Sequence, residues 1–144
     1  MVFVRFTASR LIYPTLLADM TTRSKGQEGE EIAVNFLRKK GYKIIEQNFH
    51  SRVGEIDIVA LDPSTGSGPG GNVLVFVEVK TRWSKKFGEP VEAVTPWKLN
   101  SIIKTAQYYK LLHPELPEEM RIDVVSIELE GKSPKIEHIV NAGF

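Results

Sequence analysis

Three charged residues stand inside stretches that are otherwise apolar. Glu78 and Lys80 end the valine-rich run over residues 73–80, and Asp57 stands within the apolar run over residues 56–61. Burying a charge is unfavourable unless the charge is paired or holds a metal ion. These residues are therefore either members of structural ion pairs or parts of a functional site.

The chemistry that these residue types support is metal-assisted hydrolysis of a phosphodiester. Carboxylate oxygens are ligands that Mg²⁺ and Mn²⁺ prefer, so Asp57 and Glu78 can share one ion, with the backbone carbonyl of Val79 as a third ligand. The ion would acidify a bound water and neutralise a phosphate. Lys80 would orient that water or stabilise the charge that develops at phosphorus. This mechanism needs no serine or cysteine nucleophile.

Two strands joined by a flexible link are expected to position these residues. Residues 54–61 and 73–80 have compositions typical of strands, and residues 62–72 between them are rich in Gly, Pro and Ser. Neighbouring strands connected in this way are expected to pair antiparallel.

The register of that pair decides whether the charges meet. Residues two apart in a strand point the same way, so Glu78 and Lys80 should share a face. Asp57 reaches that face only if the paired residue numbers have an odd sum, and a sum of about 135 sets Asp57 opposite Glu78. The long link also permits other registers. Strict alternation places Ile56 and Ile58 together on the face opposite Asp57.

A helix over residues 26–40 is expected to bring a further carboxylate. Ser24 is a candidate N-cap, and Glu30 lies at the edge of the apolar stripe, from which its side chain can reach the sheet. The alternative is a surface glutamate that interacts with the helix dipole. The apolar stripe consists of Gly29, Ile32, Ala33, Phe36 and Leu37.

A short basic segment follows the second strand. Trp83 stands among Arg82, Lys85 and Lys86. Cations that contact phosphates, with an aromatic ring on which a base can stack, are typical of nucleic-acid binding. A solvated loop is an equally good interpretation of so short a cluster.

The remaining segments are expected to complete one α/β domain. Thr95 and Pro96 are typical of an N-cap and a first helical position, and the helix should continue to about residue 112. An irregular link is expected over residues 47–52. Strands are expected over residues 42–46, 121–129 and 135–140.

Four other polar residues are not expected to take part in chemistry. Asp123 repeats the pattern of a carboxylate in a strand but lacks neighbours of matching chemistry, so a structural role is expected. His50 is expected to lie at the surface or in a hydrogen bond. His113 and His138 are isolated in the sequence.

Composition bounds the class of protein. The chain has 144 residues, 42% of them hydrophobic and 26% charged, which favours one globular domain. A formal net charge of only +1 means that nucleic-acid binding would need a local basic patch. The chain has no cysteine, which excludes disulfides and thiolate metal sites and fits the cytoplasm.

The first 24 residues form an N-terminal extension that is expected to be poorly ordered. Apolar residues follow Arg5 and Arg10, as in a signal peptide, but Pro14 interrupts them and export is disfavoured. Met20 is a second candidate start. No apolar run approaches the roughly 18 residues of a membrane span.

Several motifs together resemble those of the bacterial YraN family. They are Lys25-Gly26 with Gly29-Glu30, Gly54-Glu-Ile-Asp57, Phe76-Val-Glu-Val-Lys80-Thr-Arg82, Phe87-Gly88 and Arg121-Ile-Asp123. That family groups predicted endonucleases of the PD-(D/E)XK superfamily, which are distantly similar to archaeal Holliday junction resolvases. The resemblance covers residues 25–144.

The resemblance implies a restriction-endonuclease-like fold, a mixed α/β sheet flanked by helices, in a single nuclease-like domain over residues 25–144. The superfamily motif matches Asp57, Glu78 and Lys80, with Mg²⁺ or Mn²⁺ as the expected cofactor. The glutamate that resolvases carry on their first helix matches Glu30. The superfamily's proline before the aspartate is replaced here by Ile56.

The leading hypothesis is a metal-dependent endonuclease that acts on DNA, in particular branched or otherwise structured DNA. A two-fold homodimer would suit a four-way junction. Two alternatives remain. One is a module on the same fold that binds nucleic acid or a partner without turnover, and the other is a purely structural Glu78–Lys80 pair.

Overall fold

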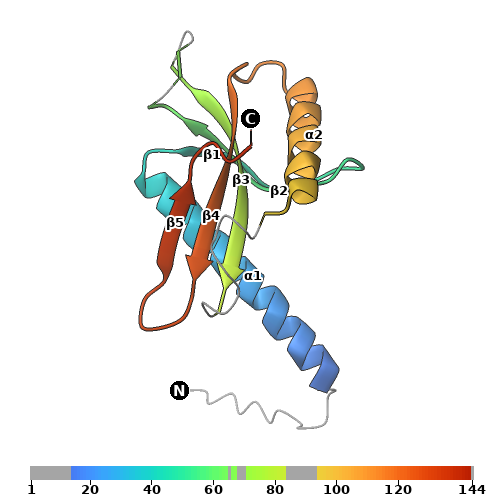
Figure 1. Cartoon of the computed structure of the whole chain (residues 1–144), viewed down its shortest axis with the longest axis vertical. Helices are drawn as coiled ribbons and strands as arrows, with labels where there is room; N and C mark the ends of the chain where they lie inside the picture. Colours follow the sequence, from blue (N-terminus) through green and yellow to red (C-terminus); the bar gives the residue numbers. More distant parts are fainter. Residues whose placement is uncertain (1–13, 65, 68–70, 84–93, 144) are drawn as a thin grey trace, which may run out of the picture.

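The structure is a computed structural model that describes residues 14–64, 66–67, 71–83 and 94–143, with side chains from residue 26 onward. A five-stranded sheet lies between two helices in this part of the chain (Figure 1). The elements are α1 (Pro14–Lys39), β1 (Lys43–His50), β2 (Glu55–Asp62), β3 (Val73–Arg82), α2 (Pro96–Leu112), β4 (Met120–Glu128) and β5 (Lys135–Ile139).

The sheet is mixed, with the strands in sequence order β1-β2-β3-β4-β5. The β1–β2, β2–β3 and β4–β5 pairs are antiparallel, whereas β3 and β4 are parallel. A parallel connection needs a crossover, which α2 provides. The arrangement confirms the expected α/β class and is consistent with a restriction-endonuclease-like fold.

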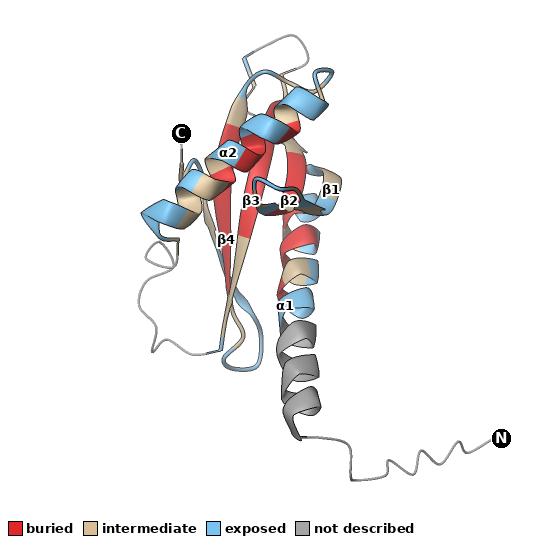
Figure 2. Cartoon of the chain, turned by 90° about the vertical axis from the view of Figure 1, so that its right-hand side faces the viewer, coloured by how far each residue is buried: buried red, intermediate tan, exposed pale blue. Residues whose placement is uncertain are grey.

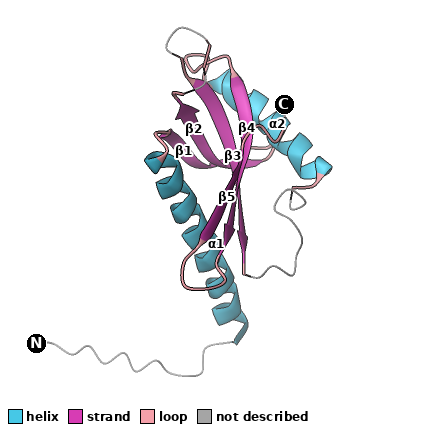
Figure 3. Ribbon diagram, turned by 60° about the vertical axis from the view of Figure 1, so that its left-hand side comes forward, coloured by secondary structure: helices cyan, strands magenta, loops and turns pink. Residues whose placement is uncertain are grey.

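The two helices cover opposite faces of the sheet (Figure 3). Ala33 and Leu37 of α1 pack on one face, and Ile102 and Tyr109 of α2 pack on the other. Figure 2 shows buried segments on both helices and on strands β2, β3 and β4. Both faces of the central strand are therefore covered, which explains why the first six residues of β3 are buried and why its sequence is a nearly continuous apolar run.

The register between β2 and β3 is the one, among those left open, whose continuation sets Asp57 opposite Glu78, although the ladder ends one pair before these two residues. The pairs run from Ile58 with Val77 to Asp62 with Val73, and their residue numbers sum to 135. The prediction for Ile56 is wrong: Ile58 packs in the α1-side core, but Ile56 packs in the α2-side core. The β2–β3 ladder stops at Ile58, beyond which β2 pairs only with β1, through Ile56 and Glu55, and departs from regular alternation.

Two predicted boundaries also differ. Helix α1 begins at Pro14 rather than near Gly26, so Ser24 lies within the helix and is not its N-cap. Strand β1 continues to His50 instead of giving way to an irregular link, with a change of register between Ile44 and Glu46. The start of α2 is as predicted, with Thr95 as its N-cap. No described helix is long and apolar enough to cross a membrane.

A buried polar network lies beside the α1-side core. Arg121 donates hydrogen bonds to Asp123 and Asp62, at 2.8 and 3.0 Å, and to the Tyr42 hydroxyl at 2.8 Å. His138 Nε2 lies 2.8 Å from Asp123. The structural role predicted for Asp123 is confirmed, but His138 is not isolated.

Helix α1 approaches β3 closely at a glycine. A Cβ atom on Gly29 would overlap Thr81 Oγ1, whereas a Cβ on Gly26 would meet nothing within 4 Å. Gly29 thus lets the helix lie near enough to β3 for its neighbour Glu30 to reach the end of the sheet. The contact rather than helix propensity accounts for the glycine.

Replacing Gly29 by Ala should therefore destabilise the protein, although alanine favours a helix by about 1 kcal/mol. Overpacking costs about 1–3 kcal/mol, so we expect a net loss of up to about 2 kcal/mol in the free energy of unfolding, measured in urea. Gly26→Ala is the matched control and should be neutral or stabilising. A stabilised Gly29→Ala protein would contradict this role of the glycine.

Candidate active site

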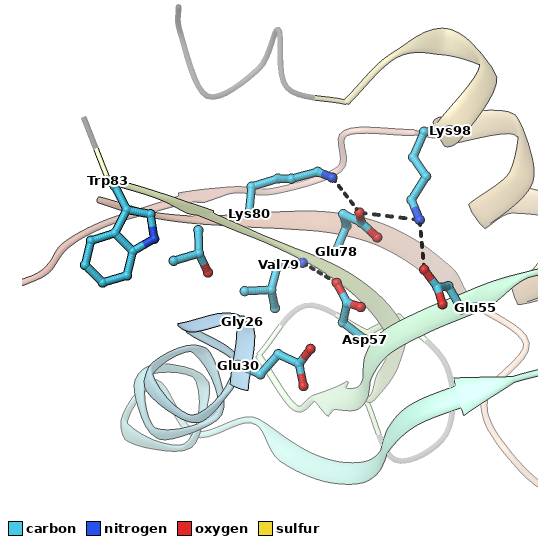
Figure 4. A pocket seen from close by; sticks show the side chains of 10 residues that line it. Gly26, Glu30, Glu55, Asp57, Glu78, Val79, Lys80, Trp83 and Lys98 are labelled. Atoms are coloured by element: carbon cyan, nitrogen blue, oxygen red, sulfur yellow. Dashed lines mark hydrogen bonds and ion pairs between the residues drawn. The ribbon is translucent and has the colours of Figure 1, made fainter. Parts of the chain in front are cut away.

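A pocket of about 540 Å³ opens where β2 and β3 cease to pair (Figure 4). Its lining includes residues from helices on both faces of the sheet, because α1 contributes Glu30 and α2 contributes Lys98. The predicted residues Asp57, Glu78 and Lys80 all line it. The full lining is Gly26, Glu30, Glu55, Asp57, Glu78, Val79, Lys80, Thr81, Trp83 and Lys98.

Asp57 occupies the gap between the two strands. Its Oδ2 accepts a hydrogen bond of 2.8 Å from the Val79 backbone N–H. The N–H and C=O of one residue in an extended strand point to the same side, so the Val79 carbonyl also faces this gap and not β4. The carboxylate of Asp57 and the carbonyl of Val79 are thereby brought to the same opening.

Glu78 is buried next to two lysines. Its side chain is only 5% exposed, and its Oε1 lies 3.0 Å from Lys80 Nζ and 3.6 Å from Lys98 Nζ. Lys80 extends from the same strand and face, as predicted. The ion pair satisfies the buried charge, as the structural alternative requires, but it also places a cation beside two carboxylates in an open pocket.

The charges around Asp57 disfavour its ionised form. Burial, followed by repulsion from Glu78 and in smaller part from Glu30, raises the pKa of Asp57 from 3.8 to about 6. The Val79 hydrogen bond and the more distant Lys98 act in the opposite direction. Figure 4 shows these three carboxyl groups and that of Glu55 around one pocket with two lysines, an excess of negative charge that a bound cation would relieve.

The donor set fits a hard divalent ion. Asp57, Glu78 and the Val79 carbonyl offer oxygen ligands, which Mg²⁺ and Mn²⁺ prefer, and leave room for water. Across the described residues, no three His, Cys, Asp or Glu side chains come close enough together to hold a metal ion by themselves. The ion would therefore depend on the backbone carbonyl and on waters to complete its coordination.

Lys98 was not among the predicted site residues. Its Nζ lies 3.6 Å from Glu78 Oε1 and 3.7 Å from Glu55 Oε1. The sequence does carry a signal: the Thr95 side chain caps α2 by accepting from the Lys98 N–H, and the residue at that position is favoured to be Glu or Gln. A lysine there conflicts with the local preference, and such conflicts tend to mark functional sites.

The predicted nucleic-acid contacts are only partly described. Trp83 lines the pocket with 47% of its surface exposed. Arg82 ends β3 in a half-exposed position outside the pocket lining, and Lys85 and Lys86 lie outside the described residues.

Away from the pocket, His113 is not isolated, since it lies 3.2 Å from Glu115 and packs on the ring of Tyr109.

Comparison with known proteins gives a family match over most of the chain. Residues 29–127 match the model of a family described as "Uncharacterised protein family UPF0102". A UPF0102 protein of Syntrophomonas wolfei is 48% identical over 120 residues, which cover 83% of this chain and 97% of that protein. A UPF0102 protein of Geobacter metallireducens is 46% identical, with 83% and 92% covered. A third, from Pelobacter propionicus, is 45% identical, with 90% and 89% covered.

Proposed function

The chain belongs to the uncharacterised protein family UPF0102, the YraN family that its motifs resemble, and from this premise we propose that it is a divalent-metal-dependent endonuclease acting on DNA. The observation that carries the proposal is the convergence of Asp57, Glu78 and Lys80 at one pocket, with the Asp57 pKa raised by burial and by the neighbouring carboxylates. A protein that only bound DNA would gain nothing from burying two carboxylates where a phosphate must lie.

In the proposed mechanism, Asp57, Glu78 and the Val79 carbonyl would hold the ion. Mg²⁺ or Mn²⁺ bound there would supply Lewis-acid chemistry, which makes water a better nucleophile and neutralises charge on a phosphate. Lys80, whose ammonium lies beside Glu78, donates to the attacking water or to the phosphate oxygens on which charge develops. The hydrogen bond from Val79 N–H fixes the orientation of Asp57.

We further propose branched or otherwise structured DNA as the substrate. Trp83 offers a partly exposed aromatic face at the pocket, on which an unpaired base can stack. Bases in an intact duplex are already stacked on one another and cannot use that face. Junctions, flaps and frayed ends have unpaired or distorted nucleotides.

The decisive experiment is a cleavage panel. The purified chain is incubated with labelled linear duplex, single-stranded, flap and four-way DNA, with Mg²⁺, with Mn²⁺ and with chelator. We expect cleavage that needs the ion and that favours the structured substrates. Absence of cleavage on every substrate with either ion would reject the nuclease proposal.

Replacing Lys80 by Ala should lower the cleavage rate by about 10²–10³-fold, the usual cost of losing one group that stabilises transition-state charge. Binding of Mn²⁺ should persist, because Asp57 and Glu78 remain. Lys104→Ala, which removes a lysine from the exposed surface of α2, is the matched control and should cleave normally. If Lys80→Ala lowers the melting temperature and leaves cleavage unchanged, Lys80 is only the structural partner of Glu78.

A further inference from the structure

Lys98 is a costly residue for the position that it occupies. It lies in the first turn of α2, a turn that contains no acidic residue, close to the positive end of the helix dipole. A cation there is disfavoured by about 0.3–1 kcal/mol, whereas a glutamate would cap the helix. The stability of the helix therefore does not explain the lysine.

The contacts of Lys98 are longer than a hydrogen bond. Its Nζ lies 3.6 Å from Glu78 and 3.7 Å from Glu55, against 3.0 Å between Lys80 and Glu78. The side chain is 24% exposed and lines the pocket, so a phosphate bound there can approach it. Glu55 itself is mostly exposed, and an ion pair with an exposed partner contributes little.

A cation bound by Glu78 would change this balance. The charge that now attracts Lys98 would be taken up by the ion, and the ammonium group would face an opening in which a phosphate must lie. Lysine is a point-charge donor suited to such a phosphate.

We propose that Lys98 is a substrate-phosphate ligand, which Glu78 and Glu55 hold at the pocket until a divalent ion occupies the carboxylates. This inference rests on the proposed function, since it assigns a further contact at the same site. It predicts opposite effects of one substitution: loss of Lys98 weakens DNA binding and strengthens ion binding.

The test measures binding and not cleavage. Affinity for labelled DNA is measured with Ca²⁺ between about 50 and 200 mM salt. Each phosphate contact adds about 0.7 to the slope of log K against log salt for single-stranded DNA, and about 0.9 for duplex DNA. For Lys98→Ala we expect the slope to fall by about one such contact, and Mn²⁺ affinity, measured by calorimetry at pH 8, to rise several-fold. Lys98→Arg should keep the wild-type slope, and so should the Lys104→Ala control.

Two outcomes would overturn the inference. One is an unchanged salt slope in Lys98→Ala, and the other is a parallel fall in DNA and Mn²⁺ affinity, which indicates a structural role. Both differ from failure of the proposed function. If the wild type binds DNA but cleaves no substrate, the nuclease proposal fails while the slope still decides the role of Lys98. If the wild type binds no DNA, both fail.

Discussion

The Asp57→Asn protein is expected to lose metal-dependent cleavage by at least about a thousandfold and yet to be more stable than the wild type at pH 8. Cleavage is lost because an amide is a poor ligand for a hard ion. The bound ion would supply several kcal/mol of transition-state stabilisation. The gain in stability follows from the pKa of about 6, which means that the folded protein holds an ionised Asp57 unfavourably. Asparagine keeps the oxygen that accepts from Val79 N–H and removes the charge.

The sign of the pH dependence is fixed by that raised pKa. The folded state binds the Asp57 proton more tightly than the unfolded state, so the contribution of Asp57 to the stability of the wild type falls as the pH rises from 3.8 to about 6. Without metal, Asp57→Asn should therefore have a higher free energy of unfolding than the wild type. The difference should reach up to about 3 kcal/mol at pH values above 6 and vanish near pH 3.8.

Thermal and urea unfolding with chelator at several pH values would measure this difference. Added Mn²⁺ should then raise the melting temperature of the wild type and not of Asp57→Asn. Undiminished cleavage by the variant, or a lower stability at pH 8, would refute the assignment of Asp57. In that case the carboxylate is an ordinary structural acceptor for the Val79 N–H.

The Arg121→Met protein is expected to lose about 3–5 kcal/mol of its free energy of unfolding, the range found when one partner of a buried ion pair is removed. Asp123 is fully buried and Asp62 nearly so, and both would keep a charge without its cation. Arg52→Met, which changes an arginine at an exposed turn, is the control and should be close to neutral.

Acid should reverse part of that loss. Hydrogen bonds, chiefly from His138 and Arg121, hold the pKa of Asp123 below its ordinary value, and Ser64 and Arg121 do the same for Asp62. The stability that this network contributes is present above the ordinary pKa and is lost as the pH falls through the lowered one. In the variant the two carboxylates lack the guanidinium group and favour protonation, so its deficit should shrink between pH 7 and pH 4. A deficit that does not depend on pH would mean that lost packing rather than charge causes it.

Much of the site could be predicted because it depends on strand geometry. Glu78 and Lys80 share a face by alternation alone, and one register of β2 on β3 brings Asp57 to them. Glu30 was placed by helical periodicity, which is equally regular. In each case the position of the backbone nearly decides where a short side chain points.

The parts that could not be predicted depend on contacts between distant segments. Lys98 has a long side chain that reaches the pocket from the start of a helix, and periodicity says nothing about its final direction. His138 meets Asp123 only because β4 and β5 pair. Ile56 changes face where β2 stops pairing with β3 and pairs only with β1, a tertiary effect that strict alternation cannot express.

The β2–β3 ladder has its other end at Asp62 and Val73, about five residues along the strand from Asp57 and so roughly 16 Å from the pocket. The chain between these two positions joins the strands on the side remote from the chemistry. Fluorophores, affinity tags or whole reporter domains grafted into that connection would leave the carboxylates and lysines untouched. Engineered versions of this protein can thus be tethered or tracked through the hairpin tip.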